Sequence, residues 1–375
     1  MLKLASFKMV FYKFFFAFNL FIKSKWVLSY PKKKPILLYD SQFILDGVYK
    51  KKTAILYKRG EEINIPVLLH CLKEFDFRFH GYLLRYINFV EPKVIVSFLS
   101  QYPKFYFLSK QTGITTILFQ HGNMAYLKSL YLKYLKKEED VFVDYIFLFN
   151  KKIQIFFDKL KIGKTILVGS FKNNKVFFRK KRKKKEVLFV SSYFDSNKNW
   201  NILKYDKIVI KHLSKLCLRK SLKFNILLKT DSNKEIDWFN NILNSSKSNS
   251  ANLIKRKKDP FHSYKKIETY KYVFGISSSL LSEAFSKKCR IGIINFRPKK
   301  YSHWVPMIKE YGQQNGPFWT VSKKINIRKF NKVFNYVINS SNLQWEELYK
   351  KYSEIMTIFD HNNKKFYSLL KKILK

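Results

Sequence analysis

The sequence predicts an α/β protein built from two Rossmann-like domains with a cleft between them. Its 375 residues exceed the size at which a single hydrophobic core stops growing. Short apolar, β-rich runs alternate with helical stretches, which is typical of parallel βαβ units. Seven consecutive cations at residues 179–185 separate two such arrays and indicate a linker. We therefore expect domains at 1–178 and 186–340, with helices in 341–375 packing back across both.

In the first array, each strand is expected where a short apolar run meets a polar turn. Asn64 followed by Pro66 predicts the start of a helix, because proline fits the first helical turn. The expected strands are residues 35–40, 54–57, 94–98, 114–119, 141–149 and 165–168.

The second array repeats this pattern after the cationic run. Helices are expected at about 200–217 and 280–286, and two more at about 344–358 and 361–374 close the chain. The expected strands are residues 187–190, 224–228, 272–276 and 290–295. Ligands of such sheets bind beyond the carboxyl ends of the strands, so residues there are the first candidates for a site.

The charge balance is strongly basic, with 74 Lys and Arg against 26 Asp and Glu, a formal net charge of +48. This excess indicates a polyanionic partner: nucleic acid, an anionic membrane surface or a phosphorylated substrate. The alternative is that an AT-rich coding sequence produced the many Lys, Phe, Tyr, Ile and Asn residues. In either case the charge attracts the protein to anionic surfaces.

The segment Met1–Leu28 is apolar and aromatic but interrupted by lysines. Its longest lysine-free part, Phe14–Ile22, is shorter than the ~20 residues that a spanning helix needs, and no cleavage site for a signal peptide follows. We expect either a helix lying in the membrane interface or a core helix of the first domain. Three widely spaced cysteines fit a reducing cytoplasm, so the expected location is cytoplasmic and peripheral at the inner membrane.

The strongest candidate site is the turn Ser277, Ser278 and Ser279, between a predicted strand and a helix. Free backbone N–H groups and the positive end of the helix make such a turn suited to an anion such as a donor phosphate. Glu283 falls one turn later, where a carboxylate could hold a ribose hydroxyl. The alternative is ordinary capping of a helix by serine, with an acidic residue in the first turn.

Gln120, His121 and Gly122, followed by Asn123, end a predicted strand of the first domain. Glycine lets the backbone turn or approach a ligand, and histidine can act as a base near neutral pH. A single histidine is more often structural. Gly169 and Ser170 end another strand on the same expected edge, so these residues form a candidate acceptor side.

Lys229 and Arg297 follow strands of the second domain and could neutralise a diphosphate. The sequence has no metal-binding cluster and no DxD-like pair in these turns, so we expect no metal and no cofactor beyond a nucleotide-sugar co-substrate. It also lacks a nucleophile elbow, a Walker A loop and a GxGxxG motif, which argues against hydrolases, kinases and dinucleotide enzymes.

Several short segments resemble the bacterial family of surface carbohydrate biosynthesis proteins. They are Arg59–Leu69, Pro92–Val96, Phe119–Gly122, Gly169–Asn174, Ser278–Ala284, Gly316–Thr320, Trp345 and Ile355–Asp360 with Asn363. The resemblance implies a GT-B-like fold and places Ser278, Ser279 and Glu283 at the donor and Gln120–Gly122 at the acceptor side. Two positions differ from the family pattern: Leu281 stands where it has glycine, and His121 stands where it often has asparagine.

The preferred function is a glycosyltransferase of surface polysaccharide synthesis. It would move a sugar from a nucleotide-sugar to a lipid-linked or oligosaccharide acceptor, with His121 as base. The alternatives are a glycerophosphate or alditol-phosphate transferase, which would share the fold, and a non-catalytic assembly protein. A nucleic-acid-binding protein is a further alternative, but no recognised nucleic-acid-binding signature is present.

Overall fold

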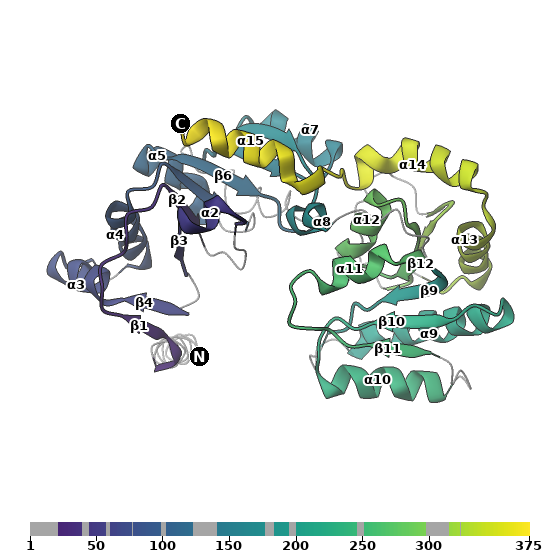
Figure 1. The fold of residues 1–375 in the computed structure, drawn as a ribbon. Coiled ribbons are helices and arrows are strands. Elements are labelled where there is room, and N and C mark those ends of the chain that lie inside the picture. Colours follow the sequence, from purple (N-terminus) through teal and green to yellow (C-terminus); the bar gives the residue numbers. More distant parts are fainter. Residues whose placement is uncertain are drawn as a thin grey trace, which may run out of the picture.

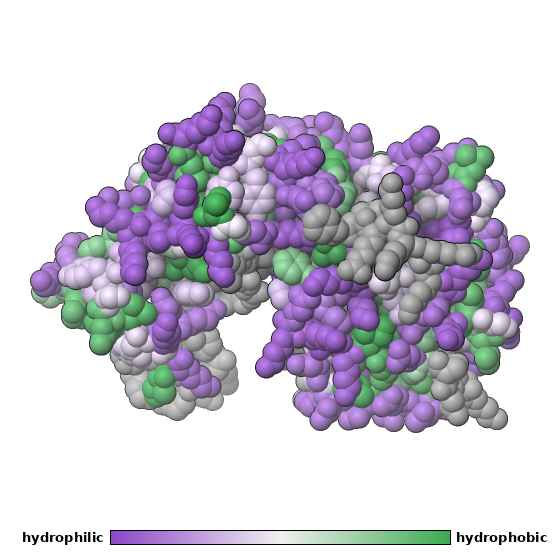
Figure 2. Space-filling view, in the orientation of Figure 1, coloured by the Kyte–Doolittle hydropathy of each residue, from purple (hydrophilic) through white to green (hydrophobic). Residues whose placement is uncertain are grey.

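The computed structural model describes residues 22–39, 45–57, 61–76, 78–98, 103–122, 141–176, 184–194, 200–245, 251–297, 315–322 and 324–375. These residues form two lobes, each built around its own sheet (Figure 1). A cleft open to solvent separates the lobes below their junction (Figure 2).

The N-terminal lobe contains a six-stranded sheet in which every strand pair is parallel. Its order is β3 (Thr53–Leu56), β2 (Ile36–Tyr39), β5 (Val94–Ser97), β6 (Thr115–Phe119), β7 (Tyr145–Leu148) and β8 (Lys164–Leu167). All residues of β2 and β5 are buried, because helices cover both faces of the sheet. The helices are α2 (Val48–Lys51), α4 (Phe79–Val90), η1 (Pro103–Phe107), α5 (Leu108–Thr112), α7 (Lys151–Leu160) and α8 (Phe171–Lys175).

The C-terminal lobe contains a seven-stranded sheet, parallel except for its last pair. Its order is β11 (Asn252–Ile254), β10 (Phe224–Leu227), β9 (Lys184–Val190), β12 (Tyr270–Gly275), β13 (Arg290–Asn295), β15 (Trp319–Val321) and β14 (Asn315–Gly316). Its helices are α9 (Trp200–Arg219), α10 (Asn233–Asn244), α11 (His262–Glu268), α12 (Ser279–Ser286) and α13 (Ile327–Asn339).

The end of the chain connects the two lobes. Helix α14 (Asn342–Met356) packs on the C-terminal lobe through Trp345 and Leu348. After the short helix η5 (His361–Asn363), α15 (Lys364–Ile373) lies over the N-terminal lobe (Figure 1). There Phe366 and Leu370 are fully buried against residues of β2, β5, β6 and β7.

A small parallel pair, β1 (Lys25–Val27) with β4 (Glu62–Asn64), lies beside α3 (Ile65–Lys73) at the outer end of the N-terminal lobe (Figure 1). The side chain of Asn64 caps α3 by accepting a hydrogen bond from the N–H of Val67 at 3.2 Å. The start of this helix therefore lies where Asn64 and Pro66 predicted it.

The predicted class of two Rossmann-like domains is confirmed, and most predicted strands begin within two residues of their expected starts. Three details differ. Strand β7 begins at Tyr145, because the N–H groups of Phe142 and Val143 bond to the carbonyls of Tyr106 and Ile162 and not to a neighbouring strand. Strand β9 begins at Lys184, so the last two cations of the expected linker lie in a strand, and 179–183 fall outside the described residues. Lys25–Val27 is a strand and not part of a helix, whereas residues 1–21 fall outside the described residues.

Across the parts of the chain that the structure describes, no helix combines the length and apolar character needed to cross a bilayer.

Candidate functional site

The strand order defines where a ligand is expected on the C-terminal sheet. The chain runs outward from β9 to β10 and β11, then returns to the other side of β9 to form β12 and β13. The loops after β9 and β12 therefore diverge at the carboxyl ends of adjacent strands. Such a switch point is the usual ligand site of an open parallel sheet.

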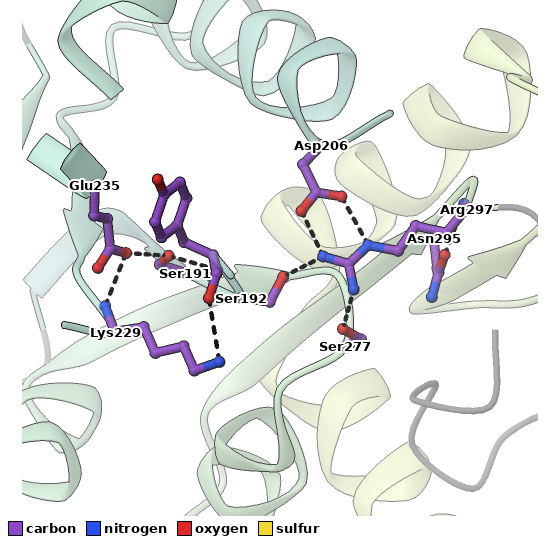
Figure 3. Close-up of polar contacts among 9 residues, drawn as sticks. Ser191, Ser192, Asp206, Lys229, Glu235, Ser277, Asn295 and Arg297 are labelled. Atoms are coloured by element: carbon purple, nitrogen blue, oxygen red, sulfur yellow. Dashed lines mark hydrogen bonds and ion pairs between the residues drawn. The ribbon is translucent and has the colours of Figure 1, made fainter. Parts of the chain in front are cut away.

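A single buried guanidinium connects the loops at this switch point (Figure 3). Arg297, 2% exposed, donates to Ser192 Oγ after β9 and to Ser277 Oγ after β12, both at 2.8 Å. Its Nε and Nη2 atoms form a bidentate ion pair with the carboxylate of Asp206, which is 2% exposed. The backbone N–H of Arg297 donates to Asn295 Oδ1 at 2.9 Å. These bonds fix the two loops relative to each other.

A buried carboxylate organises the neighbouring loops in the same way. Glu235, which is fully buried, accepts hydrogen bonds from the backbone N–H groups of Lys229 and Thr230 at 3.0 and 2.7 Å. It also accepts a bond from the Ser191 hydroxyl after β9 (Figure 3). The loops after β9 and β10 are therefore held together, and Asp206 and Glu235 each position one side of the switch point.

The turn Ser277–Ser279 lies at the edge of this frame. All three serines are half-buried, and Ser278 is the N-cap of α12, accepting a hydrogen bond from the N–H of Leu280 at 3.3 Å. The hydroxyl of Ser277 is held by Arg297. The turn thus combines capping with partial exposure at the positive end of a helix, where an anion is stabilised.

Glu283 was predicted to face a ligand, but it lies inside the junction between the lobes and is only 3% exposed. Its carboxyl group makes hydrogen bonds with Ser170 of the N-terminal lobe and Tyr264 of the C-terminal lobe. Burial raises the pKa of Glu283 to about 7, opposed by the hydrogen bond from Ser170 and by Lys172 and Lys287. Its backbone carbonyl accepts from Asn173 Nδ2 at 3.3 Å, so Glu283 joins the lobes.

Gln120 fixes the turn that carries His121 on the N-terminal sheet. Gln120 is 4% exposed; its amide donates to the carbonyl of Gly122 at 3.0 Å and accepts from the N–H of Phe149 at 2.9 Å. Gly122 has a φ of 64°, a left-handed conformation that favours glycine. His121 itself is exposed. The predicted Asn123 falls outside the described residues.

Gly169 marks the point where the end of the chain crosses back to the N-terminal lobe. It pairs with Phe359 in an isolated bridge, and a Cβ atom on Gly169 would lie 1.8 Å from the carbonyl oxygen of Ile358. Nearby, Asn174 Nδ2 donates to the side chain of Asn363 at 2.8 Å. Gly169 therefore contacts Ile358 and Phe359 of the crossing segment, and the neighbouring Ser170 makes a hydrogen bond with Glu283.

Three further predicted positions have clear surroundings. Lys229 is exposed, with Nζ 3.1 Å from the carbonyl of Tyr193 and 3.5 Å from the ring centroid of Phe194. Arg297, expected to face a diphosphate, is enclosed with Asp206. Leu281 is fully buried, and a Cβ atom on Gly275 would lie 3.0 Å from its Cδ1 atom. Its side chain therefore points into the core of the sheet, away from the half-exposed serines.

The structure brings together Ser277 and Arg297 at one place and Ser170 and Glu283 at another. Three residues of the site, Asp206, Glu235 and Tyr264, were not predicted from the sequence. Asp206 did carry a signal: it is the only acid in α9, on the same helix face as the buried Val209, Ile210 and Leu213. A lone acid on an apolar face indicates a buried partner. No group of three potential metal ligands occurs within the described ranges.

Solved structures with a similar fold share little sequence with this chain. A UDP complex of MnaA from S. aureus has a TM-score of 0.51 and 14% identity, covering 91% of this chain and 97% of that one. MurG from Acinetobacter baumannii has a TM-score of 0.48 and 9% identity, covering 90% and 99%. A glycosyltransferase from Rickettsia africae has a TM-score of 0.48 and 14% identity, covering 92% and 99%. MnaA supports the two-domain fold, and at this identity nothing more.

The sequence itself matches a known family. No curated protein matches the chain. A family model described as "putative O-antigen biosynthesis protein" matches residues 117–374, well over half of the chain. The matched range includes His121, the buried carboxylates of Asp206 and Glu235, and the Ser277–Ser279 turn. It also includes Ile358 and Phe359, where the chain crosses back to the N-terminal lobe. The chain belongs to this family of O-antigen biosynthesis proteins.

Proposed function

We propose that this protein is a glycosyltransferase that moves a sugar from a nucleotide-sugar donor to a lipid-linked or oligosaccharide acceptor during O-antigen synthesis. The family gives the biological context, and the two-lobed fold gives a cleft between two sheets. The observation that carries the proposal is the half-exposed Ser277–Ser279 turn at the positive end of α12, held by buried Arg297 at the switch point.

The donor diphosphate would lie against this turn. The serine hydroxyls and backbone N–H groups would bind phosphate oxygens, and the end of the helix would stabilise the charge that develops on the departing diphosphate. Such a site needs neither a metal ion nor another cofactor. Arg297 would act as a positioning residue here, because its guanidinium is already used by Asp206, Ser192 and Ser277.

The acceptor would approach from the N-terminal sheet, where Gln120 and Gly122 shape the turn and hold exposed His121. His121 is the candidate base for the attacking hydroxyl. Proton removal would leave an oxygen nucleophile that attacks the anomeric carbon while the bond to the diphosphate breaks. The sugar transfer would take place on the cytoplasmic face of the inner membrane, where a lipid-linked acceptor would be available.

Donor binding can be tested by thermal unfolding with UDP-, CMP-, GDP- and CDP-linked sugars, because a ligand that binds only the folded state raises its melting temperature. We expect one nucleotide class to stabilise the wild type and Ser279→Ala to reduce that shift. Ser353→Ala, at a half-buried serine of α14, is the matched control and should keep it. No shift with any donor would contradict the proposal. A shift only with CDP-alditols would favour the phosphate-transfer alternative.

The role of His121 is tested separately from binding. His121→Ala should leave the donor-dependent thermal shift intact and reduce turnover by about 10²–10⁴-fold, the usual range for a lost general base. His121→Asn introduces the residue that the resembled family often has. If His121→Asn turns over as fast as the wild type, His121 is not the base.

A further inference from the structure

Exposed apolar side chains gather at the outer end of the N-terminal lobe. The structure describes fourteen large hydrophobic residues as exposed, and nine of them fall within residues 22–79. Eight of these nine, all except Val48 on α2, belong to the segments at this end of the lobe. We call these eight the apolar patch: Ile22, Trp26, Leu28, Tyr30, Leu69, Leu72, Phe75 and Phe79. Single exposed hydrophobic residues need no explanation, but a contiguous group marks an interaction surface.

Hydrogen bonds and ring contacts hold the parts of this patch side by side. Trp26 lies opposite Ile63 in the β1–β4 pair. The next residue, Asn64, donates from Nδ2 to the carbonyl of Ser29 at 2.8 Å and also caps α3. The ring of Tyr30 lies 6.5 Å from that of His70 on α3. The segment 26–30 and helix α3 therefore present one surface.

Exposed patch residues recur at short intervals along both segments. Trp26 lies in β1, and Leu28 and Tyr30 follow it on either side of a bend at Ser29, each more than half exposed. Leu69, Leu72 and Phe75 follow each other at a spacing of three along α3 and its end. Phe75 is 84% exposed and has a φ of 52°, a backbone conformation that is unfavourable for a phenylalanine. No burial within the described chain offsets that cost.

Cations surround this surface. Residues 22–34 contain five lysines (Lys23, Lys25, Lys32, Lys33 and Lys34) and no acid. Lys25 remains 75% exposed although it lies 3.6 Å from Glu62, and Lys33 remains 71% exposed beside Glu91. Glu74 and Asp76, the acids on either side of Phe75 in the sequence, both form ion pairs with Arg85. Figure 2 shows hydrophobic atoms with hydrophilic ones around them where Figure 1 draws α3 and β1.

We propose that the apolar patch docks on a bilayer surface that contains anionic lipids, an inference that rests on the proposed function because it brings the cleft to a lipid-linked acceptor. Leu, Phe and Trp side chains can enter the acyl boundary while lysines remain at the headgroups. A second copy of the chain fits this surface less well, because two molecules of charge +48 repel each other. An anionic bilayer complements that charge.

Sedimentation with lipid vesicles tests the surface without any donor or acceptor. The wild-type protein is mixed with phosphatidylcholine vesicles and with vesicles that also contain phosphatidylglycerol. The patch variant is Leu72→Gln with Phe75→Asn, since asparagine tolerates a left-handed backbone. The control variant is Ile155→Gln with Leu343→Gln, two exposed hydrophobic residues on α7 and α14, away from the patch.

We expect the wild type and the control variant to bind the anionic vesicles, and the patch variant to bind at least about tenfold more weakly, because two apolar side chains no longer enter the bilayer. Equal binding by the patch and control variants would overturn the inference. So would a wild-type dimer that only the patch variant loses, measured by light scattering. Donor-dependent thermal shifts of both variants report separately on the proposed activity, so the two hypotheses can fail independently.

Discussion

At the scale of single residues, the pair formed by Asp206 and Arg297 is the clearest determinant of the site. Both groups are almost completely buried, and burial raises the pKa of Asp206 while the guanidinium opposes that shift. Removing one partner leaves the other charge buried without compensation, which costs more than the intact pair contributes. The two residues therefore have to be considered as one unit that holds Ser192 and Ser277 in place.

Arg297→Met should lower the free energy of unfolding by about 3–5 kcal/mol, because it leaves Asp206 unpaired. Asp206→Leu combined with Arg297→Met should recover part of that loss, since no buried charge remains. Urea unfolding measures both. Arg78→Met, at an arginine whose side chain is 81% exposed, is the control and should change stability little. A double variant less stable than Arg297→Met would contradict this view of the pair.

At single residues, local features of the site were predictable from the sequence, whereas contacts between distant residues were not. The Ser277–Ser279 turn was predictable because strand, turn and helix follow each other locally. The enclosure of Arg297 was not, since Asp206 is 91 residues away in the chain. Glu283 was placed at a ligand for the same reason: its partner Ser170 belongs to the other lobe. Residues that end parallel strands face either a ligand or another domain, and the local sequence does not distinguish these outcomes.

At the scale of elements, the strands were predictable because β2, β5, β10 and β13 are buried on both faces and consist mostly of apolar residues. The short strands β1, β4 and β11 were not predicted, because each has only three residues and none of them has a buried apolar residue. The return of the chain at Gly169 also depends on a contact between distant segments. The Asn174 and Asn363 amides that stabilise it lie 189 residues apart.

Gly169→Ala should therefore be more damaging than an ordinary glycine substitution. Its φ of 76° strains any other residue, and the added Cβ atom would meet the Ile358 carbonyl oxygen. Gly113→Ala is the matched control: its φ is 67°, but open space surrounds its Cβ position. We expect Gly113→Ala to cost about 1–2 kcal/mol and Gly169→Ala to cost clearly more, measured by thermal unfolding. Equal costs would mean that the crossing segment readily moves aside.

At the scale of the whole molecule, the junction between the lobes contains a carboxyl group that titrates near neutrality. This group is Glu283 of the C-terminal lobe, which bonds to Ser170 of the N-terminal lobe and to Tyr264. Lys287 lies close to it and donates to the carbonyl of Val176 in the N-terminal lobe. The pKa of Glu283 is raised to about 7 in the folded protein by burial, from 4.5. A raised carboxyl pKa means that its contribution to stability is complete below pH 4.5 and is lost as the pH rises towards 7.

The expected loss between these pH values is roughly 3 kcal/mol of unfolding free energy. Glu283→Gln has nearly the shape of the neutral carboxyl group and cannot ionise. The unfolding free energy of this variant, relative to that of the wild type, should therefore increase by about 3 kcal/mol between these pH values. Urea unfolding of both proteins across the pH range measures the difference. Parallel stability curves would show that Glu283 stays ionised in the folded protein.

The burial of Phe366 and Leu370 on the N-terminal sheet has a consequence for biosynthesis. The other residues of that cluster end at Phe171, so 195 further residues must be made before Phe366 arrives to cover them. At about 5–20 residues per second, the growing chain waits roughly 10–40 s with this face uncovered. Until then the ribosome carries a half-finished lobe with an apolar surface open to chaperones and to neighbouring nascent chains.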